Sequence, residues 1–305
     1  MEKRNLGHTS LTVTALGYGA MELRLLDSMR DAERVLNTVL DNGMTYIDTS
    51  PDYGLSETYI GQTIAHRRDE YVLASKCGCN VDEKGASFDP PHVWNAAQLQ
   101  KNIEQSLRLL NTEMIDVWQL HGLYPEDLAG GRHDEVIETM QRLKQQGKIR
   151  AIGMSFRNGR QGEDLFPAGF GFRDIHAFLD WNVFEVMQIV YGGLTRLNEH
   201  VIAEAAGRGL GMIIRGVVKK YADNYDELFE QASLPELCEA GESPQDFLIR
   251  FALNHPGIAT MIVGSKNPDH IAANARAAMR GKLPDDVYAE AKRRLDTAGI
   301  TAKTA

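Results

Sequence analysis

The feature that most constrains this chain is a repeated alternation of short, apolar, β-rich runs with longer amphipathic helical patterns. The runs that predict strands are Val13–Met21, Met44–Thr49, Tyr71–Lys76, Met114–His121, Ile149–Ser155, Phe184–Tyr191, Leu210–Gly216 and Ile258–Gly264. Parallel strands need a crossover connection, usually a helix, and strands in alternation with helices therefore indicate a parallel sheet. Eight such units predict an α/β fold in which the sheet closes into a (β/α)8 barrel.

An open, doubly wound sheet is the main alternative to a closed barrel. Such folds usually carry a G-x-G-x-x-G fingerprint after the first strand. Here Gly17 and Gly19 are present, but Glu22 occupies the third glycine position, so the dinucleotide fingerprint is absent. We therefore expect residues 1–305 to form a single barrel domain. Residues 4–13 are expected to form a small β-hairpin over the barrel floor, and two extra helical patterns, from Pro268 and Pro284, close the chain.

The charge and the apolar pattern exclude several classes of partner. The formal net charge is −9, which disfavours nucleic acid and anionic membrane surfaces. No apolar run approaches the roughly 18 residues of a membrane span, and the polar start lacks the apolar core of a signal peptide. We therefore expect a cytoplasmic protein with reduced cysteines. Cys77 and Cys79 form C-x-C without further ligands at a suitable spacing, so no metal site is expected.

Four titratable side chains stand where three consecutive predicted strands end. Asp48 ends the second strand and Tyr53 follows in its loop, while Lys76 and His121 end the third and fourth strands. All strands of a parallel barrel finish on the same face, where active sites lie. Each residue alone has an ordinary structural interpretation, because Asp often caps turns and a lone Lys or His is often on the surface. Their shared position indicates a site.

These four side chains suit the reduction of a carbonyl group. A phenol is a weak acid at neutral pH, and a neighbouring ammonium group makes proton donation easier. A carboxylate beside Lys76 keeps it charged and in position, and a histidine can donate a hydrogen bond that orients a carbonyl oxygen. A hydride must then come from a cofactor, because no side chain carries one.

The motifs that hold these residues resemble the aldo-keto reductase family over essentially the whole chain. "DTSPDYG" (48–54) resembles the family's Asp-x-x-x-x-Tyr loop, "ASK" (74–76) carries the matching lysine and "DVWQLHG" (116–122) the matching histidine. The resemblance implies a TIM barrel that binds NADPH, less often NADH, without a Rossmann domain. It implies a reversible NADP(H)-dependent oxidoreductase that reduces aldehydes and ketones to alcohols. Asp48 would fix Lys76, Lys76 would tune Tyr53, Tyr53 would donate the proton and His121 would align the carbonyl.

The same resemblance implies a set of cofactor-binding positions at the strand ends. By motif these are Gly19, Ala20, Met21, Ser155, Gln188, Arg215, Gly216, Val218, Gly264, Ser265, Lys266, His270 and Asn274. Ser155 and Gln188 would contact the carboxamide, and the segment from Gly264 to Asn274 would contact phosphate. Ser265 and Lys266 favour a 2′-phosphate, hence NADPH over NADH.

The chain departs from the family pattern at three of these places. Phe156 stands where an asparagine usually follows the strand-five serine, which puts one amide contact in doubt. Arg215 stands where many members carry an aromatic residue, and a guanidinium plane can stack or pair with phosphate. His270 stands where an arginine is usual, and it is mostly uncharged at neutral pH. These departures leave the choice between NADP and NAD open.

Two other functions are compatible with the same residues. A regulatory, nucleotide-binding subunit of the same fold would bind nucleotide with little or no turnover. An aldolase or lyase would need a neutral Lys76 for a Schiff base, and Asp48 argues against that. Tyr18, Met21, Leu123 and Tyr124 are candidates to line a pocket for a small carbonyl substrate. The substrate, the oligomeric state and the role of residues 156–173 stay open.

Overall fold

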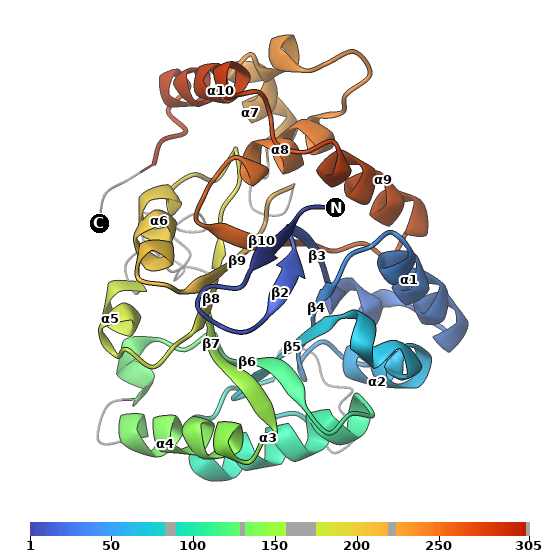
Figure 1. The fold of residues 1–305 in the computed structure, drawn as a ribbon, viewed down its shortest axis with the longest axis vertical. Helices are drawn as coiled ribbons and strands as arrows, with labels where there is room; N and C mark the ends of the chain where they lie inside the picture. Colours follow the sequence, from blue (N-terminus) through green and yellow to red (C-terminus); the bar gives the residue numbers. More distant parts are fainter. Residues whose placement is uncertain (83–89, 129–131, 157–174, 219–223, 303–305) are drawn as a thin grey trace.

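A closed barrel of parallel strands forms the centre of the computed structural model (Figure 1). The structure describes residues 1–82, 90–128, 132–156, 175–218 and 224–302. The strands pair in the order β10-β3-β4-β5-β6-β7-β8-β9, and every pair is parallel. They are β3 (Leu16–Gly19), β4 (Tyr46–Asp48), β5 (Val72–Cys77), β6 (Ile115–His121), β7 (Ile149–Ser155), β8 (Val186–Val190), β9 (Gly211–Arg215) and β10 (Ile258–Val263). The predicted closed barrel is confirmed, and the open sheet is excluded.

Helices follow the strands and surround the barrel (Figure 1). They are α1 (Met29–Asp41), α2 (Ser56–Thr63), α3 (Ala96–Leu109), α4 (Arg132–Gln145), α5 (Ile175–Asp180), α6 (Glu199–Gly207), α8 (Pro244–Leu253) and α9 (Pro268–Met279). Two more, α7 (Tyr225–Gln231) and α10 (Asp285–Thr297), lie outside α8. Short 3₁₀ turns are η1 (Ala20–Leu25), η2 (Ala65–Glu70), η3 (Pro125–Leu128) and η4 (Leu234–Leu237). Within the described ranges, no helix has both the length and the apolar composition of a membrane span.

Several helix ends follow directly from local chemistry. The Ser243 hydroxyl caps α8 and forms a reciprocal capping box with Asp246. Asn95 caps α3 by accepting from the backbone N–H of Gln98. Gly43, at φ +74°, follows the end of α1, as expected of a residue that adopts the left-handed region freely. Ser56, in contrast, is the first residue of α2 rather than its cap, and its hydroxyl donates to the carbonyl of Ala20.

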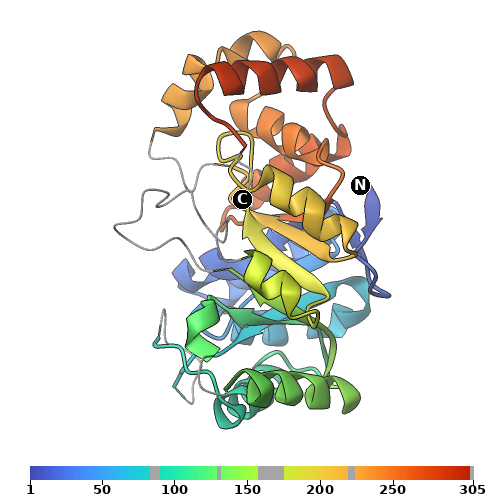
Figure 2. The same ribbon diagram turned by 90° about the vertical axis from the view of Figure 1, so that its left-hand side faces the viewer.

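A β-hairpin closes the amino-terminal end of the barrel, as predicted. Strands β1 (Lys3–Asn5) and β2 (Thr12–Thr14) pair antiparallel, and both views show the hairpin at one end of the barrel (Figures 1 and 2). Arg4 Nη1 donates to the carbonyl of Ile258 at the start of β10 (2.8 Å), and the N–H of His8 donates to the carbonyl of Gly209 before β9 (2.8 Å). The carboxyl-terminal end of the barrel is therefore the end that is available for an active site.

The predicted bounds of the first strand were wrong, because part of that run belongs to the hairpin. The run Val13–Met21 is divided between β2, β3 and the 3₁₀ turn η1, so Ala20 and Met21 follow the strand instead of belonging to it. The backbone N–H of Ala15 bonds to the carbonyl of Glu2, which ends the hairpin pairing before the barrel strand begins. An apolar run alone does not show where one sheet ends and the next begins.

The barrel interior has its own core, separate from the larger one between strands and helices. The inner core includes Tyr46, Ala74, Val117, Ala151, Val186 and Ile213 from the strands, with Leu6, Leu11 and Val13 from the hairpin. Successive side chains of a strand point to opposite faces. Two residues beyond Tyr46, Ala74 and Val117 lie Asp48, Lys76 and Gln119, which therefore also point inward at the carboxyl-terminal end.

Candidate active site

The structure brings the four predicted catalytic residues to one end of the barrel. Lys76 Nζ donates to Asp48 Oδ2 at 2.7 Å and to the carbonyl of Thr49 at 2.7 Å. The same ammonium group lies 4.7 Å from the centroid of the Tyr53 ring. The rings of Tyr53 and His121 meet edge to face with centroids 6.1 Å apart. A carboxylate, an ammonium, a phenol and an imidazole thus share one mouth.

Asp48 and Lys76 belong to a hydrogen-bonded ion-pair cluster, which we define as Asp48, Lys76, Gln119 and Gln188. Within it, Gln119 Oε1 is buried and has no hydrogen-bond partner among the described residues. Both charges are buried, and Asp48 Oδ1 also accepts from Gln119 Nε2 (3.0 Å) and Gln188 Nε2 (2.8 Å). A buried charge is tolerated when it is paired and its remaining lone pairs are hydrogen-bonded. Sequence reasoning missed Gln119, although its inward position between Val117 and His121 was a usable signal.

Ser155 and Gln188, expected near a carboxamide, lie in the same hydrogen-bonded chain. The hydroxyl of Ser155 donates to Gln188 Oε1 at 3.0 Å, and Gln188 in turn donates to Asp48. Phe156, which replaces the usual asparagine, is buried against the ring of Phe178 at 5.6 Å between centroids. Its side chain therefore belongs to the core, while its carbonyl accepts from Arg215 Nη2 at 2.9 Å.

The remaining positions that are expected to bind cofactor follow the ends of β3, β9 and β10, which are neighbours in the barrel. Gly19 ends β3, Arg215 ends β9 and Gly264 follows β10, while Gly216 and Val218 continue from β9. A Cβ on Gly264 would lie 2.8 Å from the carbonyl oxygen of Gly19, so these two segments approach closely only because residue 264 is glycine. Residues 219–223 lie outside the described residues.

Cationic and polar side chains lie at the start of α9. The Asn267 side chain caps α9 by accepting from the N–H of Asp269, and Ser265 Oγ accepts from the N–H of Asn267. Lys266 and His270 are exposed, and Asn274 lies one turn further along the helix. A helix amino terminus with an adjacent ammonium group is a favourable place for a phosphate.

Tyr18 and Leu123 pack within the protein in this structure. Both are almost fully buried, and the hydroxyl of Tyr18 donates to the carbonyl of Ser265 at 2.9 Å. Tyr18 thus links β3 to the segment before α9. Met21 and Tyr124 are partly exposed and stay candidates for the pocket. The long connections that could wall such a pocket are residues 77–91, 122–133 and 217–242, and the structure describes a part of each. Residues 157–174 are outside the described part.

A buried acid that the sequence did not indicate stands behind the ion-pair cluster. Glu57, on α2, accepts hydrogen bonds from Ser75 Oγ (2.6 Å) and Ser106 Oγ (3.2 Å). Burial raises the pKa of Glu57 to about 7, although the two hydroxyl groups and the charge of Lys76 oppose the rise. Its protonation state therefore changes near neutral pH.

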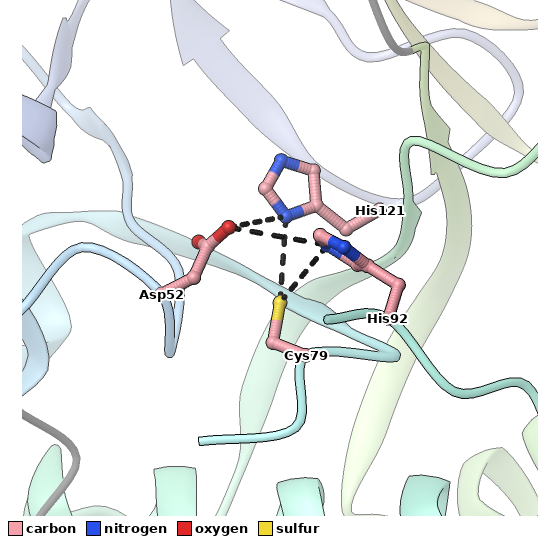
Figure 3. Close-up of side chains that lie close together, drawn as sticks. All are labelled: Asp52, Cys79, His92 and His121. Atoms are coloured by element: carbon pink, nitrogen blue, oxygen red, sulfur yellow. Dashed lines mark hydrogen bonds and ion pairs between the residues drawn. The ribbon is translucent and has the colours of Figure 1, made fainter. Parts of the chain in front are cut away.

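A second group of side chains at the mouth forms what we call the Cys–His cluster, namely Asp52, Cys79, His92 and His121 (Figure 3). His121 Nδ1 lies 3.3 Å from Asp52 Oδ2 and 3.4 Å from Cys79 Sγ. His92 Nε2 lies 3.6 Å from Cys79 Sγ and 3.9 Å from Asp52 Oδ2. No metal site was expected because C-x-C lacked further ligands at a suitable spacing. The loop after β4, the loop after β5 and the end of β6 supply these groups, so spacing along the chain could not reveal them.

Comparisons with known proteins agree with this architecture. The model of the aldo/keto reductase family matches residues 15–295. An uncharacterised oxidoreductase of Bacillus subtilis, YqkF, is 27% identical over 94% of each chain, and the aldo-keto reductase YhdN of the same organism is 26% identical over 90% of this chain and 87% of that protein. The holo form of the aldo-keto reductase AKR11C1 from Bacillus halodurans superposes with a TM-score of 0.79, at 26% identity, over 96% of each chain.

Proposed function

This chain belongs to the aldo/keto reductase family, and from that premise we propose that it reduces aldehyde and ketone carbonyls to alcohols, reversibly, with NADP(H). Oxidoreductase activity follows from the family and its named relatives. The observation that carries the finer proposal is the meeting of Asp48, Tyr53, Lys76 and His121 at the open end of the barrel. A small-molecule carbonyl compound is the partner that this site fits.

Tyr53 is the proton donor in the proposed reaction. As a carbonyl carbon is reduced, negative charge builds on its oxygen, and a phenol beside that oxygen can supply the proton. The Lys76 ammonium group, 4.7 Å from the Tyr53 ring centroid, stabilises the phenolate that remains. Asp48 holds Lys76 charged and fixed through the 2.7 Å ion pair.

His121 is the residue that orients the substrate oxygen. Its ring lies edge to face with Tyr53 at the same mouth. An imidazole N–H that points at the carbonyl oxygen stabilises developing negative charge and aligns the carbonyl with the proton donor. His121 and Tyr53 thus act on one oxygen atom from two sides.

The chain's own residues fit nicotinamide adenine dinucleotide phosphate. The fit rests on the close approach of Gly264 to Gly19 and on the donor set at the start of α9. Ser265, Lys266, His270 and Asn274 would hold phosphate, and Gly19, Ala20, Met21, Ser155, Gln188, Arg215, Gly216, Val218 and Gly264 would hold the remainder of the nucleotide. When bound, such a cofactor supplies the hydride that no side chain can. We favour NADPH because the Lys266 ammonium group complements a 2′-phosphate.

The test is an assay of reduced-nicotinamide consumption with NADPH and with NADH, using a reactive aromatic aldehyde. The Tyr53→Phe variant should lose about 10²–10⁴-fold in kcat, the usual contribution of a positioned general acid. Tyr71→Phe is the matched control, because the Tyr71 hydroxyl is buried at the start of β5 and has no hydrogen-bond partner among the described residues. Nucleotide binding without turnover in the wild type would instead favour a regulatory, nucleotide-binding protein.

A further inference from the structure

The Cys–His cluster directs four donor atoms of different chemistry toward one point (Figure 3). One atom each from Asp52, Cys79, His92 and His121 lies within 4.8 Å of all the others. A thiolate, two imidazoles and a carboxylate are the donors that Zn²⁺ uses in proteins, and four protein ligands make a closed, structural site. We propose that these residues bind one Zn²⁺ ion beside the mouth of the barrel.

Three of the six distances between the donor atoms match the edges of a zinc tetrahedron. Zinc bond lengths and tetrahedral angles place nitrogen and sulfur ligands about 3.5 Å apart, and nitrogen and oxygen ligands about 3.3 Å apart. The two nitrogen–sulfur distances are 3.4 Å and 3.6 Å. The two nitrogen–oxygen distances are 3.3 Å and 3.9 Å. The other two pairs, His92 with His121 and Asp52 with Cys79, lie within 4.8 Å. Binding must shorten the contact between His92 and Asp52 and any other pair that lies beyond the tetrahedral edge.

Hydrogen bonds alone explain these contacts less well. His121 Nδ1 lies near three potential partners, which are Asp52 Oδ2 at 3.3 Å, Cys79 Sγ at 3.4 Å and Ser50 Oγ at 3.4 Å. A ring nitrogen carries one hydrogen at most, and a good N–H···O hydrogen bond is shorter, at about 2.7–3.2 Å. One hydrogen bond at His121 Nδ1 therefore does not account for all three contacts, whereas a cation between the ligands would bring Asp52 Oδ2 and Cys79 Sγ close to that nitrogen.

One oxygen of Asp52 lacks a hydrogen-bond partner within the described part of the chain. This oxygen, Oδ1, is buried. A thiolate is the form of cysteine that binds zinc, so the thiol proton of Cys79 leaves to solvent when the ion binds.

The backbone holds Cys79 and His92 side by side. They form an isolated antiparallel bridge across the loop that follows β5. The N–H of Val93 bonds to the carbonyl of Gly78 at 2.7 Å, and the N–H of Asn80 bonds to the carbonyl of Pro91 at 2.9 Å. Cys79 and His92 are therefore a non-hydrogen-bonded pair, the type in which opposing side chains lie closest.

Helix α3 anchors this loop from behind. The amide groups of Gln98 and Asn102 both donate to the carbonyl of Cys79 at 2.8 Å, and Asn102 Oδ1 accepts from the N–H of Gly78 at 2.9 Å. The ring of His92 stacks on Trp94 with centroids 5.7 Å apart. The ligands are thus held by second contacts, as in established metal sites.

Zinc at this site would also fix the tautomer of His121, the residue that orients the substrate oxygen in the proposed function. Coordination through Nδ1 leaves the ring hydrogen on Nε2, which points away from the other three side chains in Figure 3. That tautomer is the one that donates a hydrogen bond through Nε2. This consequence rests on the proposed function, whereas metal binding itself does not.

The test is to strip the full-length protein with a chelator and to titrate it with Zn²⁺ and, separately, with Co²⁺. Metal analysis should give one equivalent of Zn²⁺ per chain, and bound Co²⁺ should show a thiolate-to-cobalt absorption band. Cys79→Ser should abolish that band, and Cys79→Ser and His92→Asn should each weaken Zn²⁺ binding at least 100-fold. Binding should release a proton to the buffer.

Cys77→Ser is the matched control, because Cys77 is equally buried two residues earlier but its thiol donates to the carbonyl of Gln119. It should retain the full equivalent of metal and the cobalt band. Substoichiometric metal in the wild type, or undiminished binding in both Cys79→Ser and His92→Asn, overturns the proposal. Stoichiometry is measured without substrate, so an inactive but zinc-bound protein contradicts only the proposed reaction.

Discussion

The ion-pair cluster and the Cys–His cluster lie side by side at the same barrel mouth, yet their buried charged groups are partnered differently. In the first, each charge has an opposite charge, and Asp48 accepts from Lys76, Gln119 and Gln188. In the second, one nitrogen of His121 faces three competing neighbours, and Asp52 Oδ1 has no hydrogen-bond partner among the described residues. Each cluster thus has one buried oxygen without a partner among the described residues, Gln119 Oε1 in the first and Asp52 Oδ1 in the second. The difference is that protein groups alone balance the charges of the first cluster, whereas the proposed cation would balance those of the second.

The largest effect on stability is expected when the ion pair between Lys76 and Asp48 is broken. Lys76→Met leaves the buried Asp48 carboxylate without its counter-charge, and should lower the free energy of unfolding by about 3–5 kcal/mol. Urea denaturation measures this loss. The double variant Lys76→Met/Asp48→Asn removes both charges and should recover a large part of it. If the free energy of unfolding of Lys76→Met lay within about 0.5 kcal/mol of the wild-type value, the ion pair would not be needed for the stability of the fold.

Glu57 tests whether a buried acid without a counter-charge behaves differently from Asp48. Its pKa is raised from 4.5 to about 7, so the folded state binds the proton more tightly than the unfolded state. The stabilisation is fully present below about pH 4.5 and is lost as the pH rises to 7. The loss is on the order of 3 kcal/mol.

Glu57→Gln should remove that pH dependence, because an amide can replace a protonated carboxyl between Ser75 and Ser106. Denaturant unfolding between pH 5 and pH 8 should show the variant gaining on the wild type as pH rises, with the largest gap above pH 7. Parallel stability curves for the two proteins would show that Glu57 is ionised in the same range folded and unfolded.

The Cys–His cluster should stabilise the fold only when metal is present. With free Zn²⁺ at about 100 times its Kd, the wild type should gain about 2.7 kcal/mol over the stripped protein. Cys79→Ser should gain nothing from Zn²⁺, and Cys77→Ser should gain as much as the wild type. Thermal unfolding with and without a chelator measures the difference, and an equal zinc response in all three proteins would remove the distinction between the clusters.

An exposed lysine provides the smallest expected effect. Lys266 lies at the start of α9 and is exposed, unlike the buried Lys76. Lys266→Ala should weaken NADPH binding about tenfold, or about 1.4 kcal/mol, and leave NADH binding nearly unchanged, because only NADPH carries the 2′-phosphate. The effect should shrink with added salt. Lys282→Ala, an exposed lysine paired with Asp285, is the control, and an equal loss for both nucleotides would oppose the preference for NADPH.

The sequence by itself determined the barrel and which side chains point into its mouth. Alternating apolar runs defined the strands, and the two-residue period of a strand carried Tyr46 to Asp48 and Ala74 to Lys76 on the inner face. Strand ends of a parallel barrel meet at one face whatever the loops do. The positions of Asp48, Lys76 and His121 could therefore be predicted from local pattern alone.

Only the tertiary structure decided which groups beyond the strands meet. Tyr18 could be predicted as a strand residue, but its hydrogen bond to Ser265 depends on the closure of β3 onto β10. Asp52, Cys79 and His92 occupy loops, whose backbone follows no fixed period, and each is an ordinary residue in its local context. They converge because the Cys79–His92 bridge and the anchoring of Cys79 by α3 fix the loop after β5 against His121. Long-range backbone contacts set that geometry, and a local sequence pattern does not encode them.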